Sequence, residues 1–82
     1  MEKVLVINGS EHSAGIDITG IDCPDTRNKS FGTLMAKYLK RTPVHLSILN
    51  GSNEWIARST TSWIGDHLSD IQEKKLDVLF LI

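Results

Sequence analysis

Cysteine is almost absent from the sequence, since Cys23 is the only one in 82 residues. A single thiol cannot form an internal disulfide, so the chain lacks the framework that holds many small secreted domains together. It also lacks a continuous apolar run of the roughly 20 residues that a transmembrane helix needs. The first residues have the pattern of a strand rather than that of a signal peptide. We therefore expect a cytoplasmic protein that does not bind membranes.

The sequence also has no marked excess of positive or negative charge. Nine basic and ten acidic residues give a net charge of −1, and they form no basic stripe of the kind that nucleic-acid-binding domains carry. The best basic cluster, Lys37, Lys40 and Arg41, falls at the end of a predicted helix, where positive charge interacts favourably with the helix dipole. We expect no binding to nucleic acid.

Closely spaced metal ligands are missing as well. Cys23 and His12 lie in a polar stretch with Asp17, Asp22 and Asp25, but none of them forms the tight ligand pair typical of a metal site. The stretch is better interpreted as a polar loop, and we expect neither a metal nor a cofactor.

What the chain does contain is an alternation of apolar runs and helical periodicities. The predicted elements are a strand at 3–8, a long loop at 9–29, a helix from 31 to 41, a strand at 44–49, a helix from 53 to 74 and a strand at 76–82. Strands that alternate with helices predict an α/β domain with a parallel sheet and right-handed crossovers. We expect a three-layer, flavodoxin-like arrangement with strand order 2-1-3.

Both predicted helices have a cap and an apolar stripe. Ser30 caps the first, and Ser52 or Asn53 caps the second. In the first helix, the large apolar residues on one face are Phe31, Leu34, Met35, Tyr38 and Leu39. The buried stripe predicted for the second helix is Ile56, Thr60, Trp63, Ile64, His67, Leu68 and Ile71. Trp55 lies off that stripe, so it can be either the wall of a pocket or an exposed side chain.

The last predicted strand affects the expected domain organisation. Its final five residues, 78–82, are all apolar, which predicts burial on both faces. A domain of this size buries only about 60% of the surface that its unfolded chain exposes, so its stability is marginal. We therefore expect residues 1–82 to be a single partial domain, truncated after the third strand. Its last strand would be covered by a second copy or by a missing C-terminal segment.

Two loops rich in small residues follow the first two strands. The first begins Gly9-Ser10-Glu11-His12, and the second is 50–53, Asn50-Gly51-Ser52-Asn53. The carboxyl ends of parallel strands meet at one edge of the sheet, where ligands bind in open α/β folds. Gly9 permits a sharp turn, Ser10 offers a hydroxyl, and Glu11 or His12 could orient or deprotonate a neighbour. Amides at the start of the second helix favour an oxyanion. A tight turn and ordinary helix capping remain the alternatives.

These two loops resemble the SGNH hydrolase (GDSL-like esterase/lipase) superfamily, especially its virus-encoded and phage-like members. Residues 9–15, Gly9-Ser10-Glu11-His12-Ser13-Ala14-Gly15, are similar to the family's first block, Gly-Asp-Ser-x-Thr-Ala-Gly, with the same interval between glycines. Residues 46–60 are similar to the second block and its helix, which often begins Gly-Ser-Ser-Asn. The resemblance implies hydrolysis of an ester, on a small molecule, glycan or lipid, through an acyl-serine intermediate.

The resemblance also assigns roles to individual positions. With both glycines aligned, the nucleophilic serine falls on Glu11, whereas a shift of one residue makes Ser10 the nucleophile. Gly9, Asn50, Gly51 and Asn53 occupy the positions that bind the oxyanion or the substrate. The later blocks, which hold the Asp and His that activate the nucleophile, would lie beyond the last residue. We therefore expect weak activity or none from this chain by itself.

Two other functions fit the same pattern. The first strand and its Gly9-Ser10 turn resemble the opening of flavodoxin-like flavin reductases, which bind a flavin or nucleotide phosphate, although Glu11 would repel a phosphate. A non-catalytic assembly module, in which a homo-oligomer covers the last strand, is the third possibility.

Overall fold

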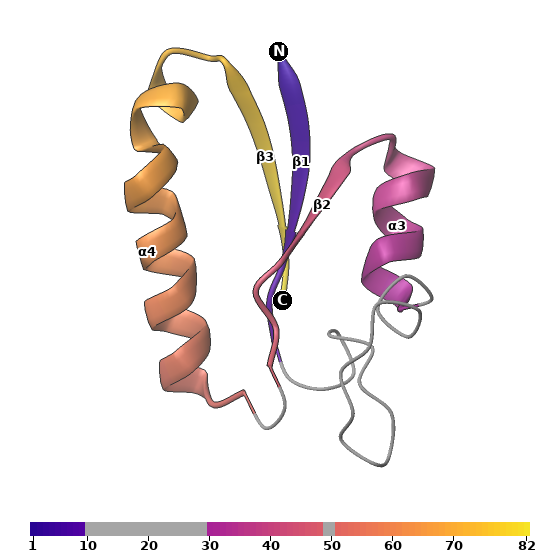
Figure 1. Ribbon diagram of the computed structural model, residues 1–82, viewed down its shortest axis with the longest axis vertical. Helices are drawn as coiled ribbons and strands as arrows, with labels where there is room; N and C mark the ends of the chain where they lie inside the picture. The colour runs from indigo at the N-terminus through magenta and orange to yellow at the C-terminus, as the bar shows by residue number, and fades with distance from the viewer. Residues whose placement is uncertain (10–29, 49–50) are drawn as a thin grey trace.

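A computed structural model of the protein describes residues 1–9, 30–48 and 51–82. Its elements, in chain order, are β1 (Glu2–Ile7), α3 (Phe31–Leu39), β2 (Thr42–His45), α4 (Asn53–Gln72) and β3 (Leu76–Leu81). The strands form a parallel sheet in the order β2-β1-β3. Figure 1 shows α3 and α4 on opposite sides of this sheet. The predicted three-layer α/β architecture and the 2-1-3 strand order are therefore confirmed.

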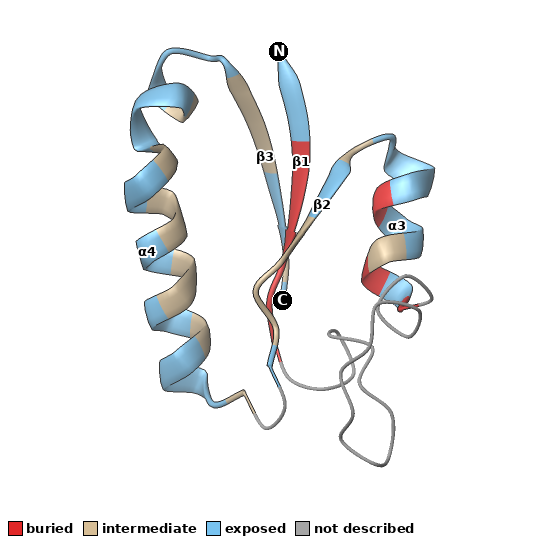
Figure 2. Ribbon diagram, in the orientation of Figure 1, coloured by how far each residue is buried: buried red, intermediate tan, exposed pale blue. Residues whose placement is uncertain are grey.

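The core is centred on β1, the middle strand. Its residues from Val4 to Ile7 are all buried, and Figure 2 shows this half of β1 in the colour of buried residues. Leu5 and Ile7 form one cluster with Ala36 of α3, and Leu81 of β3 packs against it. A central parallel strand is covered on both faces, which explains why the sequence of β1 is apolar without alternation.

The face that α3 buries is not the one with the large apolar residues. Gly32 and Ala36 are buried, whereas the predicted apolar face is largely exposed, with Tyr38 82% accessible. A Cβ on Gly32 would lie 2.9 Å from Cγ2 of Ile7, so the missing side chain lets the helix approach β1 closely. Small residues on the sheet side of α3 allow a close contact that larger ones would prevent. The predicted cap is confirmed, because Ser30 accepts a hydrogen bond from the amide of Thr33.

β2 (Thr42–His45) is shorter than the predicted strand at 44–49, and it begins two residues before it. It includes Pro43, which an edge strand tolerates because the missing N–H need not meet a neighbouring strand. After β2 the chain stays beside the end of β1: the amide of Leu46 donates to the Ile7 carbonyl (2.9 Å), and the amide of Ile48 donates to the Gly9 carbonyl (3.4 Å). The chain thus enters the second loop in contact with the first.

α4 covers the other face of the sheet. Ser52 is its cap and accepts a hydrogen bond from the amide of Trp55 (3.1 Å). The predicted stripe is half-buried except for Leu68, which is exposed. The helix ends at Gln72, two residues before the predicted end, because Lys74 adopts a left-handed conformation with φ of 58°.

β3 runs beside β1 over its whole length, from the pair Glu2 and Leu76 to the pair Ile7 and Leu81. The predicted burial on both faces was wrong for its middle residues, since Leu79 and Phe80 are 44% and 38% exposed. Within the described residues β3 has a neighbour on one side only, and an edge strand leaves part of its side chains accessible. In the same described segments, none of the helices has the length and apolar character needed to cross a membrane.

Arg41, the residue before β2, is hydrogen-bonded to β1 and β3 at the end of the sheet opposite the loops. Its Nη1 atom donates hydrogen bonds of 3.1 Å to the carbonyls of Val4 and Asp77 and to the Asp77 carboxylate. The Arg41 side chain is only 16% exposed, so its replacement leaves partly buried acceptors without a donor. We expect Arg41→Ala to lower the free energy of unfolding by about 2 kcal/mol, measured by urea denaturation.

Arg58→Ala is the matched control. Arg58 is paired with Glu54 one turn away in α4, and both side chains are exposed. Exposed pairs of this kind contribute about 0.5 kcal/mol or less. A loss as large in Arg58→Ala as in Arg41→Ala would show that the hydrogen bonds from Arg41 to β1 and β3 have no special role.

Candidate functional site

The two glycine loops are in backbone contact at the carboxyl edge of the sheet. A Cβ built on Gly51 would overlap the carbonyl oxygen of Gly9, and it would lie 3.1 Å from the Gly9 carbonyl carbon. Gly9 itself has φ of 150°, a conformation that side chains disfavour. Both positions therefore require glycine, one for its conformation and the other for the close approach. This contact brings the first loop to the start of α4.

Asn8 holds this contact in place. Its side chain is fully buried, and its Nδ2 atom donates to Ser59 Oγ (2.7 Å), to Thr60 Oγ1 (2.9 Å) and more weakly to the Ile56 carbonyl (3.3 Å) of α4. Its Oδ1 atom accepts a hydrogen bond from the Gly9 amide (2.9 Å). One amide group thus ties the end of β1, the start of the first loop and the first half of α4 together. The sequence signal for this role was a polar residue at the end of an apolar strand.

The amides of both glycines have partners within the protein. The Gly9 amide donates to Asn8, and the Gly51 amide donates to the Ile48 carbonyl (3.2 Å). Neither amide points outward as an oxyanion donor in this arrangement. Asn53, the first residue of α4, is exposed beside them. The other predicted site residues, Ser10, Glu11 and Asn50, lie outside the described residues.

The histidines of the described segments belong to packing contacts. The His45 Nε2 atom is 3.0 Å from Thr33 Oγ1 and links β2 to α3. His67 stacks on the indole of Trp63, with ring centroids 4.1 Å apart. Among residues 1–9, 30–48 and 51–82, no group of three His, Cys, Asp or Glu side chains could hold a metal ion. His12, Cys23 and the aspartates of the long loop lie outside these ranges.

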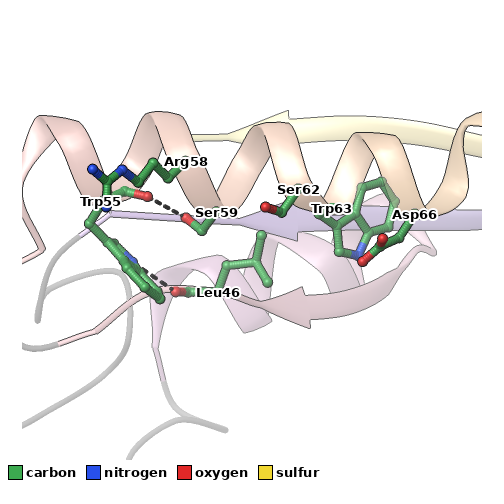
Figure 3. A pocket seen from close by; sticks show the side chains of 7 residues that line it. All are labelled: Leu46, Trp55, Arg58, Ser59, Ser62, Trp63 and Asp66. Atoms are coloured by element: carbon green, nitrogen blue, oxygen red, sulfur yellow. Dashed lines mark hydrogen bonds between the residues drawn. The ribbon is translucent and has the colours of Figure 1, made fainter.

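A pocket of about 380 Å³ lies along α4, on the side next to the end of β2. Figure 3 shows its lining residues: Leu46, Trp55, Arg58, Ser59, Ser62, Trp63 and Asp66. Trp55 lines this pocket and is also 37% exposed, so both alternatives that the sequence left open hold in part. The lining also includes Arg58, Ser62 and Asp66, which were not among the predicted site residues. Their spacing of three to four residues from one another and from Trp55 was the available signal, because it places them along one side of a helix.

The chain matches no family model, no curated protein and no solved structure.

Proposed function

We propose that the carboxyl edge of the sheet is the front half of an ester-hydrolase site of the SGNH type, with weak activity in this chain. The observation that carries this proposal is the backbone contact between Gly9 and Gly51, which joins the two loops that resemble the family's first and second blocks. In open α/β sheets this edge is the usual place for ligands. Esters of small molecules, glycans or lipids are the proposed substrates, and the cytoplasm is the proposed compartment.

The proposed reaction uses Ser10, the residue after Gly9, as nucleophile, with Glu11 as the alternative residue at the reacting position. The Ser10 oxygen bonds to the ester carbonyl carbon, the bond to the leaving alcohol breaks, and the serine proton ends on that alcohol. Water then hydrolyses the acyl-serine and restores the hydroxyl. Because the Gly9 and Gly51 amides are engaged, we assign the oxyanion to the Asn50 amide and the Asn53 side chain.

The test is hydrolysis of p-nitrophenyl acetate by the purified chain. We expect slow turnover above the buffer rate that falls to the buffer rate in Ser10→Ala, because the attacking oxygen is gone. Ser69→Ala is the matched control, since Ser69 is an exposed residue of α4 far from the loops, and it should keep the full rate. Turnover that persists in Ser10→Ala removes Ser10 as nucleophile, and loss in Glu11→Gln alone would identify Glu11 as the reacting residue.

A further inference from the structure

The pocket along α4 contains both tryptophans of the protein, Trp55 and Trp63. They are eight residues apart in one helix, so their Cα atoms are separated by about 12 Å along its axis. The pocket volume of about 380 Å³ falls within the roughly 300 to 1,000 Å³ of small-molecule sites. None of its lining residues belongs to the glycine loops. Ligand binding in this pocket is therefore independent of the proposed hydrolase function.

The two indoles have different roles in this pocket. Trp63 is held by His67, which stacks on it, and by Phe80, which meets it at 90° with centroids 6.1 Å apart. Trp55 is 37% exposed, and its Nε1 atom donates a long hydrogen bond to the Leu46 carbonyl (3.4 Å). In Figure 3 the Trp55 and Trp63 side chains lie at the two ends of the pocket. Trp55 is therefore an accessible aromatic platform, and Trp63 is a rigid wall.

The polar groups between the indoles determine the class of ligand. Arg58 and Asp66 are the charged residues of the lining, one of each sign, and the guanidinium of Arg58 is already paired with Glu54. Because the positive and the negative charge of the lining balance, the pocket does not favour a phosphate or another anion. Ser59 donates to the Trp55 carbonyl and accepts from Asn8, so Ser62, Asp66 and the outer N–H groups of Arg58 are the groups left to bind a ligand.

A second hollow, shallow and open, adjoins the pocket on the outer surface of α4. It has a volume of about 400 Å³ and shares Arg58 and Ser62 with the first, the other lining residues being Ala57 and Thr61. A chain-like ligand can occupy both hollows by crossing Arg58 and Ser62, whereas one small ring fills only one of them.

We propose that this pocket binds a neutral oligosaccharide, with one sugar ring stacked on Trp55 and its hydroxyls bonded to Asp66, Ser62 and Arg58. The C–H face of a sugar ring packs on an aromatic ring, while its hydroxyls need donors and acceptors around the rim. A sugar chain also explains the two joined hollows and the absence of a net charge in the lining.

Tryptophan fluorescence tests this proposal directly, because both fluorophores line the pocket. The full chain is titrated with cellotetraose, xylotetraose and chitotetraose, and calorimetry gives the affinity independently. We expect a saturable change with at least one of them, with a dissociation constant in the millimolar range. Trp55→Ala should weaken binding about tenfold, because an aromatic contact of this kind contributes on that order.

Asp66→Asn and Asp70→Asn form the matched pair of variants. Both remove one negative charge from α4, but Asp70 lies one turn beyond the pocket and is exposed. Weaker binding in Asp66→Asn with unchanged binding in Asp70→Asn supports the site. The proposal is overturned if none of the three sugars gives a saturable change in a folded protein. Affinity that survives Trp55→Ala also overturns it, as does tighter binding of AMP than of any of the sugars.

Discussion

Replacement of Asn8 by alanine should lower the free energy of unfolding by about 3 kcal/mol, because it removes several hydrogen bonds of a buried side chain together. The Asn8 amide bridges Ser59 and Thr60 of α4 and also accepts from the Gly9 amide. In the variant the buried Gly9 amide loses its acceptor. Urea denaturation followed by circular dichroism measures the loss.

The size of that effect depends on burial, and Asn53→Ala is the matched control. Asn53 is exposed at the start of α4, and surface substitutions of this kind usually change stability by less than about 0.5 kcal/mol. Thr60→Val removes one of the acceptors of Asn8 and should cost about 1 kcal/mol. Equal losses in Asn8→Ala and Asn53→Ala would show that the buried bridge does not stabilise the fold, and Thr60→Val allows the comparison even if Asn8→Ala fails to fold.

Gly51→Ala should destabilise the protein by about 2 kcal/mol, since an added Cβ collides with backbone that cannot rotate away. The colliding atom is the Gly9 carbonyl oxygen, and the Ile48 carbonyl oxygen lies 3.4 Å from the same position. The start of α4 can accommodate the methyl group only by moving away from the end of β1. The same variant should therefore reduce any Ser10-dependent ester hydrolysis more than its stability alone predicts.

Gly65→Ala provides a control for which the expected change in the free energy of unfolding has the opposite sign. Gly65 lies within α4, and a Cβ there meets nothing within 4 Å. Alanine is a better helix former than glycine by about 1 kcal/mol, so this variant should be more stable than the natural chain. Both free energies of unfolding come from the same denaturation experiment. Stabilisation by both substitutions would mean that Gly9 and Gly51 are not in contact in solution.

If Gly51→Ala shows the expected loss, Gly9 and Gly51 form a rigid contact at the carboxyl edge of the sheet. A rigid arrangement is what a hydrolase site needs, because the attacking oxygen and the oxyanion donors must keep their relative positions during the reaction. The pocket along α4 has no lining residue from the two glycine loops, and its sugar-binding test gives an independent result.

The alternation of strands and helices was predictable from local patterns. The apolar run of β1, the helical period after Ser52 and the caps at Ser30 and Ser52 are all recognisable within a few residues of sequence. Strand boundaries were less predictable. β2 includes Pro43 because it lies at an edge of the sheet, and edge position is a property of the assembled sheet, not of the segment.

The sequence by itself determined the fold class and the positions of the two glycine loops, because hydrophobic period and capping act between near neighbours. Only the tertiary structure decided that α3 packs through Gly32 and Ala36, that the Gly9 carbonyl lies against Gly51, and that Trp55 lines a pocket. Each of these features depends on atoms far apart in the chain. Their positions follow from close packing around β1, and no local sequence pattern predicts that packing.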